Sequence, residues 1–291
     1  MKIVKMKGGL GNQLFQYAFA LLLARESGEE VKLDMSTYQD LLEDPVRQPR
    51  ILKFKTSLGL ASRDEIRKIC LFKHEGNMLS TSYKIKIAAE AVLNPKYFFE
   101  RDRRHRDVST IMQHKYFDGY WQSWRNVDAI WDECKTQLTP KSALHEETQA
   151  MIAKVSAQNS VFVGVRRGDY QSRAAHYGGF SQEYYSEAIS IIKQRVQDPV
   201  FYVFSNDMDW VKKSLDFQGE TVIYREQEDI IDDFDELLIM SKCKHAIIIN
   251  STYHWWGARL EDHEGKVVVA PKNWFFDQKP IDIVPNGWIR I

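Results

Sequence analysis

The chain has 291 residues, 44% of them hydrophobic and 12% aromatic, and its 40 Lys and Arg residues balance 40 Asp and Glu residues. This length predicts two domains of ordinary size, and the composition is too apolar for a disordered protein. A net charge of zero gives no overall attraction to nucleic acid or anionic lipid, so an anionic ligand needs a local site. The three cysteines are far apart and odd in number, which favours reduced thiols and excludes a Cys-x-x-Cys zinc site.

The N-terminus runs directly into a predicted strand, with no hydrophobic leader before it, and the longest apolar run, "AFALLLA", is too short to span a bilayer. We therefore expect a cytoplasmic protein without a nucleic-acid partner. The sequence is also compatible with peripheral contact at the inner face of a membrane.

A single α/β unit is predicted at the start of the chain. We expect a strand at residues 2–6, a glycine loop, a helix at about 14–27 and a strand at 31–34. Gly9-Leu10-Gly11 matches only the first half of the G-x-G-x-x-G dinucleotide fingerprint, because Leu14 stands at its last position. The glycines therefore call for an explanation other than a nicotinamide cofactor.

The pattern is irregular up to about residue 160 and regular after it. In the irregular part we expect helices near 63–70 and 124–134 and a strand near 114–118. In the regular part we expect strands at 161–165, 200–205, 220–224, 245–250 and 266–270, and helices at 181–196 (with Ser181 as N-cap), 207–215, 232–243 and 253–260. Short apolar strands alternating with helices predict a parallel sheet covered by helices, with ligands bound beyond the carboxyl ends of the strands.

Two arginines follow the first strand of this regular part, in the run Arg166-Arg167-Gly168-Asp169-Tyr170. Neighbouring residues of a strand face opposite ways, so one arginine can point into the ligand crevice while the other turns into the protein. A guanidinium presents paired donors that suit phosphate oxygens, and Asp169 can hold one guanidinium in place. The same residues also fit a surface ion pair.

Polar residues follow two further strands. Ser205, Asn206 and Asp207 form a turn before a predicted helix, where an N-cap is the plain interpretation. Asn250-Ser251-Thr252-Tyr253 enters another helix, whose backbone N–H groups and positive dipole end can bind phosphate. A capped helix without a ligand fits that segment equally well.

Asp233-Phe234-Asp235 has the D-x-D spacing with which metal-dependent glycosyltransferases hold a divalent ion and a diphosphate. These acids lie in the opening turn of a predicted helix, where the helix dipole favours carboxylates without any metal. We therefore expect no metal site here.

Taken together, the motifs resemble the α-1,2-fucosyltransferases. The resembling segments are "GGLGNQLFQYAFA", "FDGYWQS" (117–123), "VRRGDY" (165–170), "YVFSNDMDW" (202–210), "LLIMSKCKHAIIINSTYHWWGARL" (237–260), "VVVAPKNWF" (267–275) and "IVPNGWIRI" (283–291). They occur in the family order and extend from the first residues to the last.

The resemblance implies a GT-B type fold, in which two Rossmann-like domains face each other across a cleft. We place an acceptor-side domain with the glycine loop at 1–155, a nucleotide-binding domain at 156–276 and a tail at 277–291. It also implies GDP-β-L-fucose as the donor, a galactose-terminated oligosaccharide as the acceptor, inversion at the anomeric carbon and no required metal or other cofactor.

The resemblance further implies roles for individual residues. Arg166 is expected to bind the β-phosphate, Asp169 to orient an arginine, and Asn12 to line the cleft with a donor and an acceptor group. The expected donor-binding residues are Gly9, Gly11, Gln13, Arg167, Ser205, Asp207, Asn250, Ser251, Thr252 and Tyr253. The general base stays open among His254, Glu183 and Asp207.

Four positions depart from the family pattern. Gly164 stands where the family has a histidine that contacts guanine, and Asn206 stands where Asp is common. His254 and Arg259 replace a serine and a tryptophan of the family helix. Two alternatives therefore accompany the fucosyltransferase hypothesis: an enzyme of the same fold with another donor or linkage, and a nucleotide-sugar-binding protein that has lost catalysis.

Overall fold

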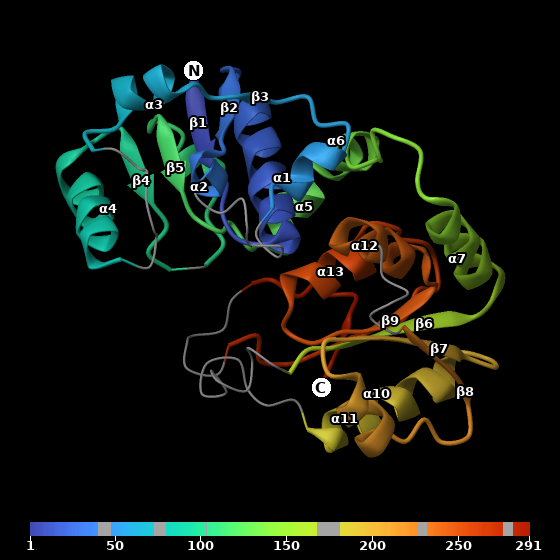
Figure 1. Ribbon diagram of the computed structural model, residues 1–291. Coiled ribbons are helices and arrows are strands. Elements are labelled where there is room, and N and C mark those ends of the chain that lie inside the picture. The colour runs from blue at the N-terminus through green and yellow to red at the C-terminus, as the bar shows by residue number, and fades with distance from the viewer. Residues whose placement is uncertain (40–47, 73–79, 103, 168–180, 226–231, 276–281) are drawn as a thin grey trace. The chain divides into compact units, whose positions relative to one another are not determined.

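A computed structural model describes residues 1–39, 48–72, 80–102, 104–167, 181–225, 232–275 and 282–291. The chain divides into two compact units, Met1–Lys141 and Ser142–Ile291. Each unit contains a sheet whose described strand pairs are parallel, and helices cover both faces of each sheet (Figure 1). The predicted pair of Rossmann-like α/β units is thereby confirmed.

The sheet of the first unit has the strand order β3-β2-β1-β5-β4. Its strands are β1 (Lys2–Lys5), β2 (Val31–Asp34), β3 (Gly59–Leu60), β4 (Tyr97–Phe99) and β5 (Tyr116–Asp118). The chain runs from β1 outward through β2 to β3, and β5 then pairs with the other side of β1. The topological switch point of this sheet, where such folds bind ligands, therefore lies between β1 and β5.

Helix α1 (Leu10–Ser27) begins earlier than the predicted residue 14. The carbonyl oxygen of Gly9 accepts the N–H groups of Asn12 and Gln13 at 3.0 and 3.1 Å, which closes the first helical turn inside the glycine segment. Gly28 ends the helix in the left-handed conformation, with φ 63°. Gly11, Asn12 and Gln13 are thus helical residues and do not belong to a loop.

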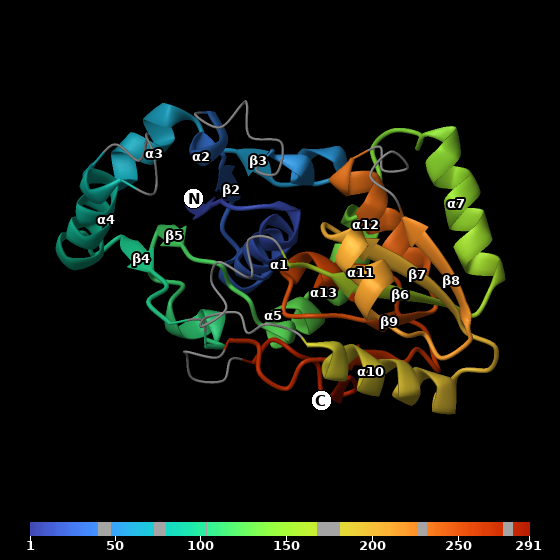
Figure 2. The same cartoon turned by 60° about the horizontal axis from the view of Figure 1, so that its bottom comes forward.

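The helices of the first unit lie on both faces of its sheet. They are α1 with α5 (Trp124–Ala129) and α6 (Trp131–Gln137) on one face, and α3 (Arg63–Ile69) with α4 (Thr81–Leu93) on the other (Figure 2). Short segments α2 (Ser36–Gln39), η1 (Arg50–Lys53) and η2 (Val108–Thr110) complete the unit. The predicted helix at 124–134 is interrupted at Ile130, which separates α5 from α6.

Buried charges meet at the carboxyl ends of β1 and β5. The Asp118 carboxylate, 2% exposed, lies 2.5 Å from Lys7 Nζ and 3.5 Å from Lys5 Nζ, and it accepts the Tyr97 hydroxyl at 2.7 Å. Burial by itself would raise the pKa of Asp118, but the charges of Lys7 and Lys5 hold it below its ordinary value. This network anchors the strand end from which the glycine turn departs.

The sheet of the second unit has the order β11-β10-β9-β6-β7-β8. Its strands are β6 (Ser160–Val165), β7 (Val200–Ser205), β8 (Thr221–Arg225), β9 (His245–Ile247), β10 (Val268–Ala270) and β11 (Ile289–Arg290). The chain winds outward from β6 to β8, then returns to the other side of β6 and continues to β11. The switch point of this sheet therefore lies between β6 and β9.

Helices cover both faces of this second sheet (Figure 1). They are α10 (Gln182–Arg195) and α11 (Met208–Ser214) on one face, and α7 (Glu146–Ala157), α12 (Asp233–Lys242) and α13 (Thr252–Arg259) on the other. Val161, Val163 and Val203 point from the strands toward the α10 side and pack against its apolar residues, including Ile189 and Ile192. The predicted alternation of strands and helices after residue 160 is confirmed, with ends shifted by a few residues.

Two boundaries differ from those expected from the sequence. Helix α7 packs against α12 and β6, so the second unit begins at Ser142 and includes residues that we placed in the first domain. In the expected tail, β11 pairs with β10 and extends the sheet. Ser181 does occupy the N-cap of α10, but its side chain makes no capping hydrogen bond.

Candidate active site

Arg167 is fixed at the carboxyl end of β6 by the turn that follows β7. Its backbone N–H donates to Asn206 Oδ1 at 2.9 Å, and its Nε lies 3.2 Å from Asp207 Oδ2. Its guanidinium also stacks 3.9 Å from the ring centre of Trp210 on α11. Arg167 is thus held against the turn after β7 and against α11.

Arg166 directly follows β6 and precedes Arg167. It is partly buried, and it lies close enough to His254 for its charge to lower the pKa of that imidazole. Asp169, which we expected to orient an arginine, lies outside the described residues. In the described structure Asp207 takes that role for Arg167.

Ser205 and Asp207 shape the turn after β7. The Ser205 hydroxyl accepts the N–H of Asp207 at 2.9 Å, and Asp207 in turn caps α11 by accepting the N–H of Trp210 at 3.2 Å. Both side chains therefore have structural partners, and their place beside Arg167 makes them supports of the arginine.

The N-terminus of α13 follows β9, on the far side of the switch point from Arg167. Ser251 is its N-cap residue and makes no side-chain capping hydrogen bond, so the helix entry keeps the geometry of an anion-binding site. Asn250 is buried and donates from Nδ2 to the carbonyl of Trp274 at 2.7 Å, which fixes the strand end. Thr252 begins the helix directly above this end.

Tyr253 ties α13 to α12. Its hydroxyl donates to the carbonyl oxygen of Asp233 and lies 3.1 Å from Glu236 Oε2. Burial raises the pKa of Glu236 to about 7, against the lowering effects of the Tyr253 hydroxyl and the Arg225 charge. Glu236 was not among the sequence candidates, and a carboxyl group with this pKa can accept a proton near neutral pH.

Asp235 of the D-x-D segment and the preceding Asp232 both have structural roles. Asp235 is 3% exposed and accepts the Thr148 hydroxyl of α7 at 2.9 Å, while Asp232 caps the same helix by accepting the N–H groups of Phe234 and Asp235. In the described parts of the chain, no group of three or more His, Cys, Asp or Glu side chains has an arrangement that could hold a metal ion.

Gly164 and His254 are in direct contact across the switch point. A Cβ atom on Gly164 would lie 2.4 Å from His254 Nδ1 and 2.7 Å from its Cγ. His254 is 6% exposed, and burial followed by the charge of Arg166 lowers its pKa to about 3. Its ring is therefore neutral at physiological pH.

In the first unit, the glycine turn is shaped by Gly8, a residue to which the sequence analysis gave no role. Gly8 has φ +81°, and a Cβ atom there would lie 2.7 Å from Asn12 Nδ2. The Asn12 amide oxygen accepts Gln122 Nε2, from the "FDGYWQS" motif, at 2.8 Å. Gly9 follows as the N-cap of α1.

Gln13 is fully buried. Its Nε2 donates to the carbonyl oxygens of Gly8 and Gln48, and its Oε1 accepts the N–H of Ile51 at 2.9 Å. These bonds tie the glycine turn to η1. Gln13 thus positions the turn, and its amide is committed to the protein backbone.

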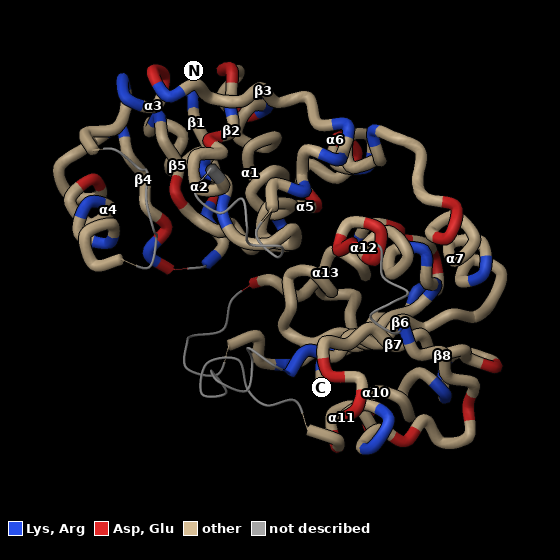
Figure 3. The backbone as a smooth tube through the Cα atoms, in the orientation of Figure 1, with Lys and Arg blue, Asp and Glu red and all other residues tan. Residues whose placement is uncertain are grey.

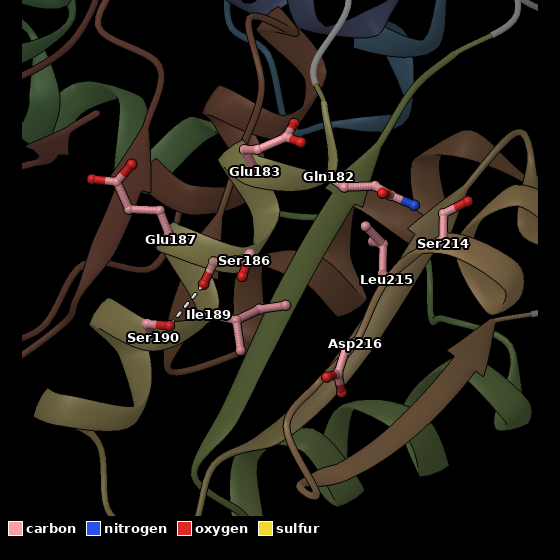
Figure 4. A pocket seen from close by; sticks show the side chains of 9 residues that line it. All are labelled: Gln182, Glu183, Ser186, Glu187, Ile189, Ser190, Ser214, Leu215 and Asp216. Atoms are coloured by element: carbon pink, nitrogen blue, oxygen red, sulfur yellow. Dashed lines mark hydrogen bonds between the residues drawn. The ribbon is translucent and has the colours of Figure 1, made fainter.

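A groove of about 520 Å³ lies between α10 and the end of α11 (Figure 4). Its ionisable lining residues are Glu183, Glu187 and Asp216, and serines of both helices supply most of the remaining polar groups. Carboxylates repel a diphosphate, so this groove is unsuited to a nucleotide-sugar donor. Lys and Arg are mixed with Asp and Glu along the backbone of each unit (Figure 3). Arg166 and Arg167 follow directly after β6.

The predicted site residues therefore form two groups. In the second unit, the described site residues lie at or just after the carboxyl ends of β6, β7 and β9: Arg166, Arg167, Ser205, Asp207, Asn250, Ser251, Thr252 and Tyr253. In the first unit, Gly9, Gly11, Asn12 and Gln13 gather at the carboxyl end of β1. Both groups lie at the edges where parallel sheets bind ligands. None of the helices in the described ranges is long and apolar enough to cross a membrane.

Comparison with known proteins decides the family. The model of glycosyl transferase family 11 matches residues 1–291. The chain belongs to glycosyl transferase family 11. The resemblance to α-1,2-fucosyltransferases that the motifs indicate is confirmed at this level, and the protein is a glycosyltransferase that uses a nucleotide sugar.

Two relatives agree with this assignment. An α-1,2-colitosyltransferase of Escherichia coli is 27% identical, over 99% of this family 11 chain and 98% of the relative. A galactoside 2-α-L-fucosyltransferase of Mus musculus, Sec1, is 26% identical over 89% of this chain and 64% of the relative. The crystal structure of fucosyltransferase NodZ from Bradyrhizobium superposes with a TM-score of 0.48 at 11% identity, covering 89% of this chain and 93% of that one.

Proposed function

We propose that this glycosyltransferase transfers L-fucose from GDP-β-L-fucose to the 2-hydroxyl group of a terminal galactose, with inversion at the anomeric carbon. The observation that carries the proposal is the β6–β9 switch point of a family 11 chain, where Arg166 and the entry of α13 stand on either side of the crevice. A guanidinium and a helix N-terminus are the groups that bind a diphosphate.

The mechanism follows from where charge develops. Cleavage of the bond between fucose and phosphate leaves negative charge on the β-phosphate and oxocarbenium character on the sugar. Arg166 stabilises that leaving group, assisted by the α13 entry at Ser251 and Thr252. We assign Arg167 to support of the chain next to Arg166, because its Nε pairs with Asp207 and its guanidinium stacks on Trp210.

The glycine turn of the first unit contributes backbone and amide groups to the donor. Gly9 and Gly11 permit close approach of the main chain, and the Asn12 amide, whose oxygen accepts Gln122 Nε2, supplies polar groups at this turn. Gln13 acts through the turn that it anchors. Asp169 stays a predicted partner of an arginine, and contact with a membrane surface stays a prediction.

The surroundings of the three candidate residues bear on the choice of the general base. Asp207 is already paired with Arg167, and Glu183 is exposed, with its pKa lowered by the Ser181 hydroxyl. The pKa of His254, about 3, makes the imidazole a weak base. These properties weigh against each of the three sequence candidates.

Transfer is expected to continue in the presence of EDTA. Arg166 and the α13 entry compensate the charge of the leaving diphosphate, and Asp235 is bonded to Thr148 inside the protein. An initial-rate assay with and without chelator checks this, with Asp233→Ala as the matched variant. A complete loss of transfer that Mn²⁺ or Mg²⁺ restores would establish a metal requirement.

GDP is expected to bind clearly more tightly than UDP or ADP. A site shaped for guanine leaves its polar groups unpaired when another base enters, and this costs affinity. Titration calorimetry with the three nucleoside diphosphates measures the preference. Equal affinities, or a preference for UDP, would refute the GDP-fucose assignment.

Transfer of colitose is the second candidate. An E. coli relative that aligns with this chain over 98% of its length is named an α-1,2-colitosyltransferase. Colitose lacks the 3-hydroxyl group of fucose. A site that hydrogen-bonds this hydroxyl rejects the analogue without it, whereas an apolar site accepts both sugars. Competition between the two GDP-sugars, read as the ratio of their kcat/KM values, decides between these donors.

A further inference from the structure

The His254 ring occupies the space beside Gly164 that a side chain at residue 164 would need, near the carboxyl end of β6. The imidazole ring lies where any side chain of residue 164 would begin, since a Cβ atom there would be 2.4 Å from Nδ1 and 2.6 Å from Cε1. These separations are well below van der Waals contact. Gly164 does not have a positive φ, so the ring, and not the backbone, requires a glycine here.

The imidazole of His254 is buried without a protein partner for one of its nitrogens. The residue is 6% exposed, and Nδ1 makes no hydrogen bond to any described residue. Buried polar atoms in folded proteins nearly always have partners, and an unsatisfied one calls for a functional reason. Because the ring is neutral at pH 7, one nitrogen donates and the other accepts, which suits a polar ligand group without net charge.

The imidazole ring of His254 lies at the place in the sheet where ligands of such folds bind. It lies between β6 and the helix that follows β9, at the switch point of the sheet. Arg166 follows Gly164 by two residues on the strand, and Ser251 precedes His254 by three residues at the helix entry. The imidazole is therefore flanked by the two elements to which we assigned the diphosphate.

We propose that Gly164 and His254 form one coupled unit that presents an imidazole from α13 to the nucleotide of the donor. The strand position carries no side chain, and the helix position supplies the hydrogen bond in its place. The two departures from the α-1,2-fucosyltransferase pattern at these positions are then a single exchange of an imidazole between neighbouring elements. This inference rests on the proposed function, because its ligand is the donor nucleotide.

The test is a double-substitution cycle on the full chain, with the Kd for GDP and the Tm measured for every variant. His254→Ser is expected to raise the Kd for GDP about five- to tenfold, since one hydrogen bond is lost. Gly164→His alone puts two rings in one space and is expected to lower the Tm. The double variant Gly164→His with His254→Ser is expected to recover the Tm and a Kd within about threefold of the parent chain.

His245→Ser is the matched control. His245 is a buried histidine of the same sheet, 9% exposed, whose Nδ1 accepts the N–H of Val267 at 3.0 Å near the opposite, amino-terminal end of β9. Its replacement is expected to lower the Tm without changing the Kd for GDP. His254→Asn is a second variant, which keeps polar groups at this position.

Three results would overturn the inference. The first is a His254→Ser variant that binds GDP as tightly as the parent chain, and the second is a loss no larger than that of His245→Ser. The third is a double variant that regains the Tm but not the affinity, which would reduce the pair to packing. If the parent chain prefers UDP or ADP, the proposed donor fails, and the same cycle with that nucleotide still tests the imidazole.

Discussion

Replacing Arg166 with alanine is expected to reduce the rate of fucose transfer by about two to three powers of ten, which is the usual cost of losing one preorganised donor at a developing oxyanion. Arg166 directly follows the strand that borders the switch point, and its neighbour Arg167 is engaged by Asp207 and Trp210. The fold should persist, because a partly buried side chain at a strand end contributes little to the core.

Steady-state kinetics and circular dichroism on purified variants measure the two effects separately. Arg166→Lys should recover little activity, since an ammonium group does not reproduce the planar pair of donors. Arg195→Ala is the matched control, because this exposed arginine lies in the last turn of α10, away from the strand ends that form the site. Retention of more than about a tenth of the activity in Arg166→Ala would contradict its role as the main leaving-group ligand.

Replacing Asp118 with alanine is expected to lower the free energy of unfolding by about 3–5 kcal/mol, because the change leaves buried cations without their counter-charge. Lys5 is fully buried and Lys7 nearly so, and both rely on the Asp118 carboxylate. The loss should be accompanied by loss of transfer, since this network holds the strand end that leads into the glycine turn.

Urea unfolding of both proteins checks this value, with Glu133→Ala as the control. Glu133 pairs with Arg25 on the surface, with both side chains more than 40% exposed, so its removal should cost at most about 1 kcal/mol. A similar small cost for Asp118→Ala would contradict the network. Because the folded-state pKa of Asp118 lies below its unfolded value, its contribution is present at neutral pH and should fade only as the pH falls below about 4.

The second unit was predictable because its signals are local. Each strand is a short apolar run and each helix has its own apolar face. Both patterns can be recognised from residues that are close together in the sequence. The same holds for the residues after β6, β7 and β9, since the carboxyl ends of parallel strands meet at one edge. Arg166, Ser205 and Ser251 could therefore be placed at one edge of the sheet from the sequence, whereas their expected roles came from the resemblance to the α-1,2-fucosyltransferases.

The first unit was less predictable, because its short strands β3 and β4 depend on pairing partners far away in sequence. The start of α1 was placed too late, since glycines rarely open a helix and only the Gly9 carbonyl reveals the first turn. Gly8 was missed because its positive φ does not show in a sequence of consecutive glycines.

The remaining features could not be predicted because they depend on contacts between residues that are distant in sequence. Nothing in the local pattern of Gly164 or His254 indicates that one fills the space of the other, although both positions stood out as departures from the family pattern. In the sequence there is no sign that the charges of Lys5, Lys7 and Asp118 belong together. The sheet brings them into one buried network. Such pairs follow from topology and burial, which single-sequence patterns do not contain.

Fucose transfer to the 2-hydroxyl group is tested by incubating the purified chain with GDP-fucose and a panel of galactose-terminated oligosaccharides, followed by linkage analysis of the product. We expect release of one GDP for each fucose transferred, and an α-linkage from fucose to the 2-hydroxyl of the terminal galactose. A product linked at another hydroxyl, or GDP-fucose that is left unchanged with every acceptor while GDP still binds, would contradict it.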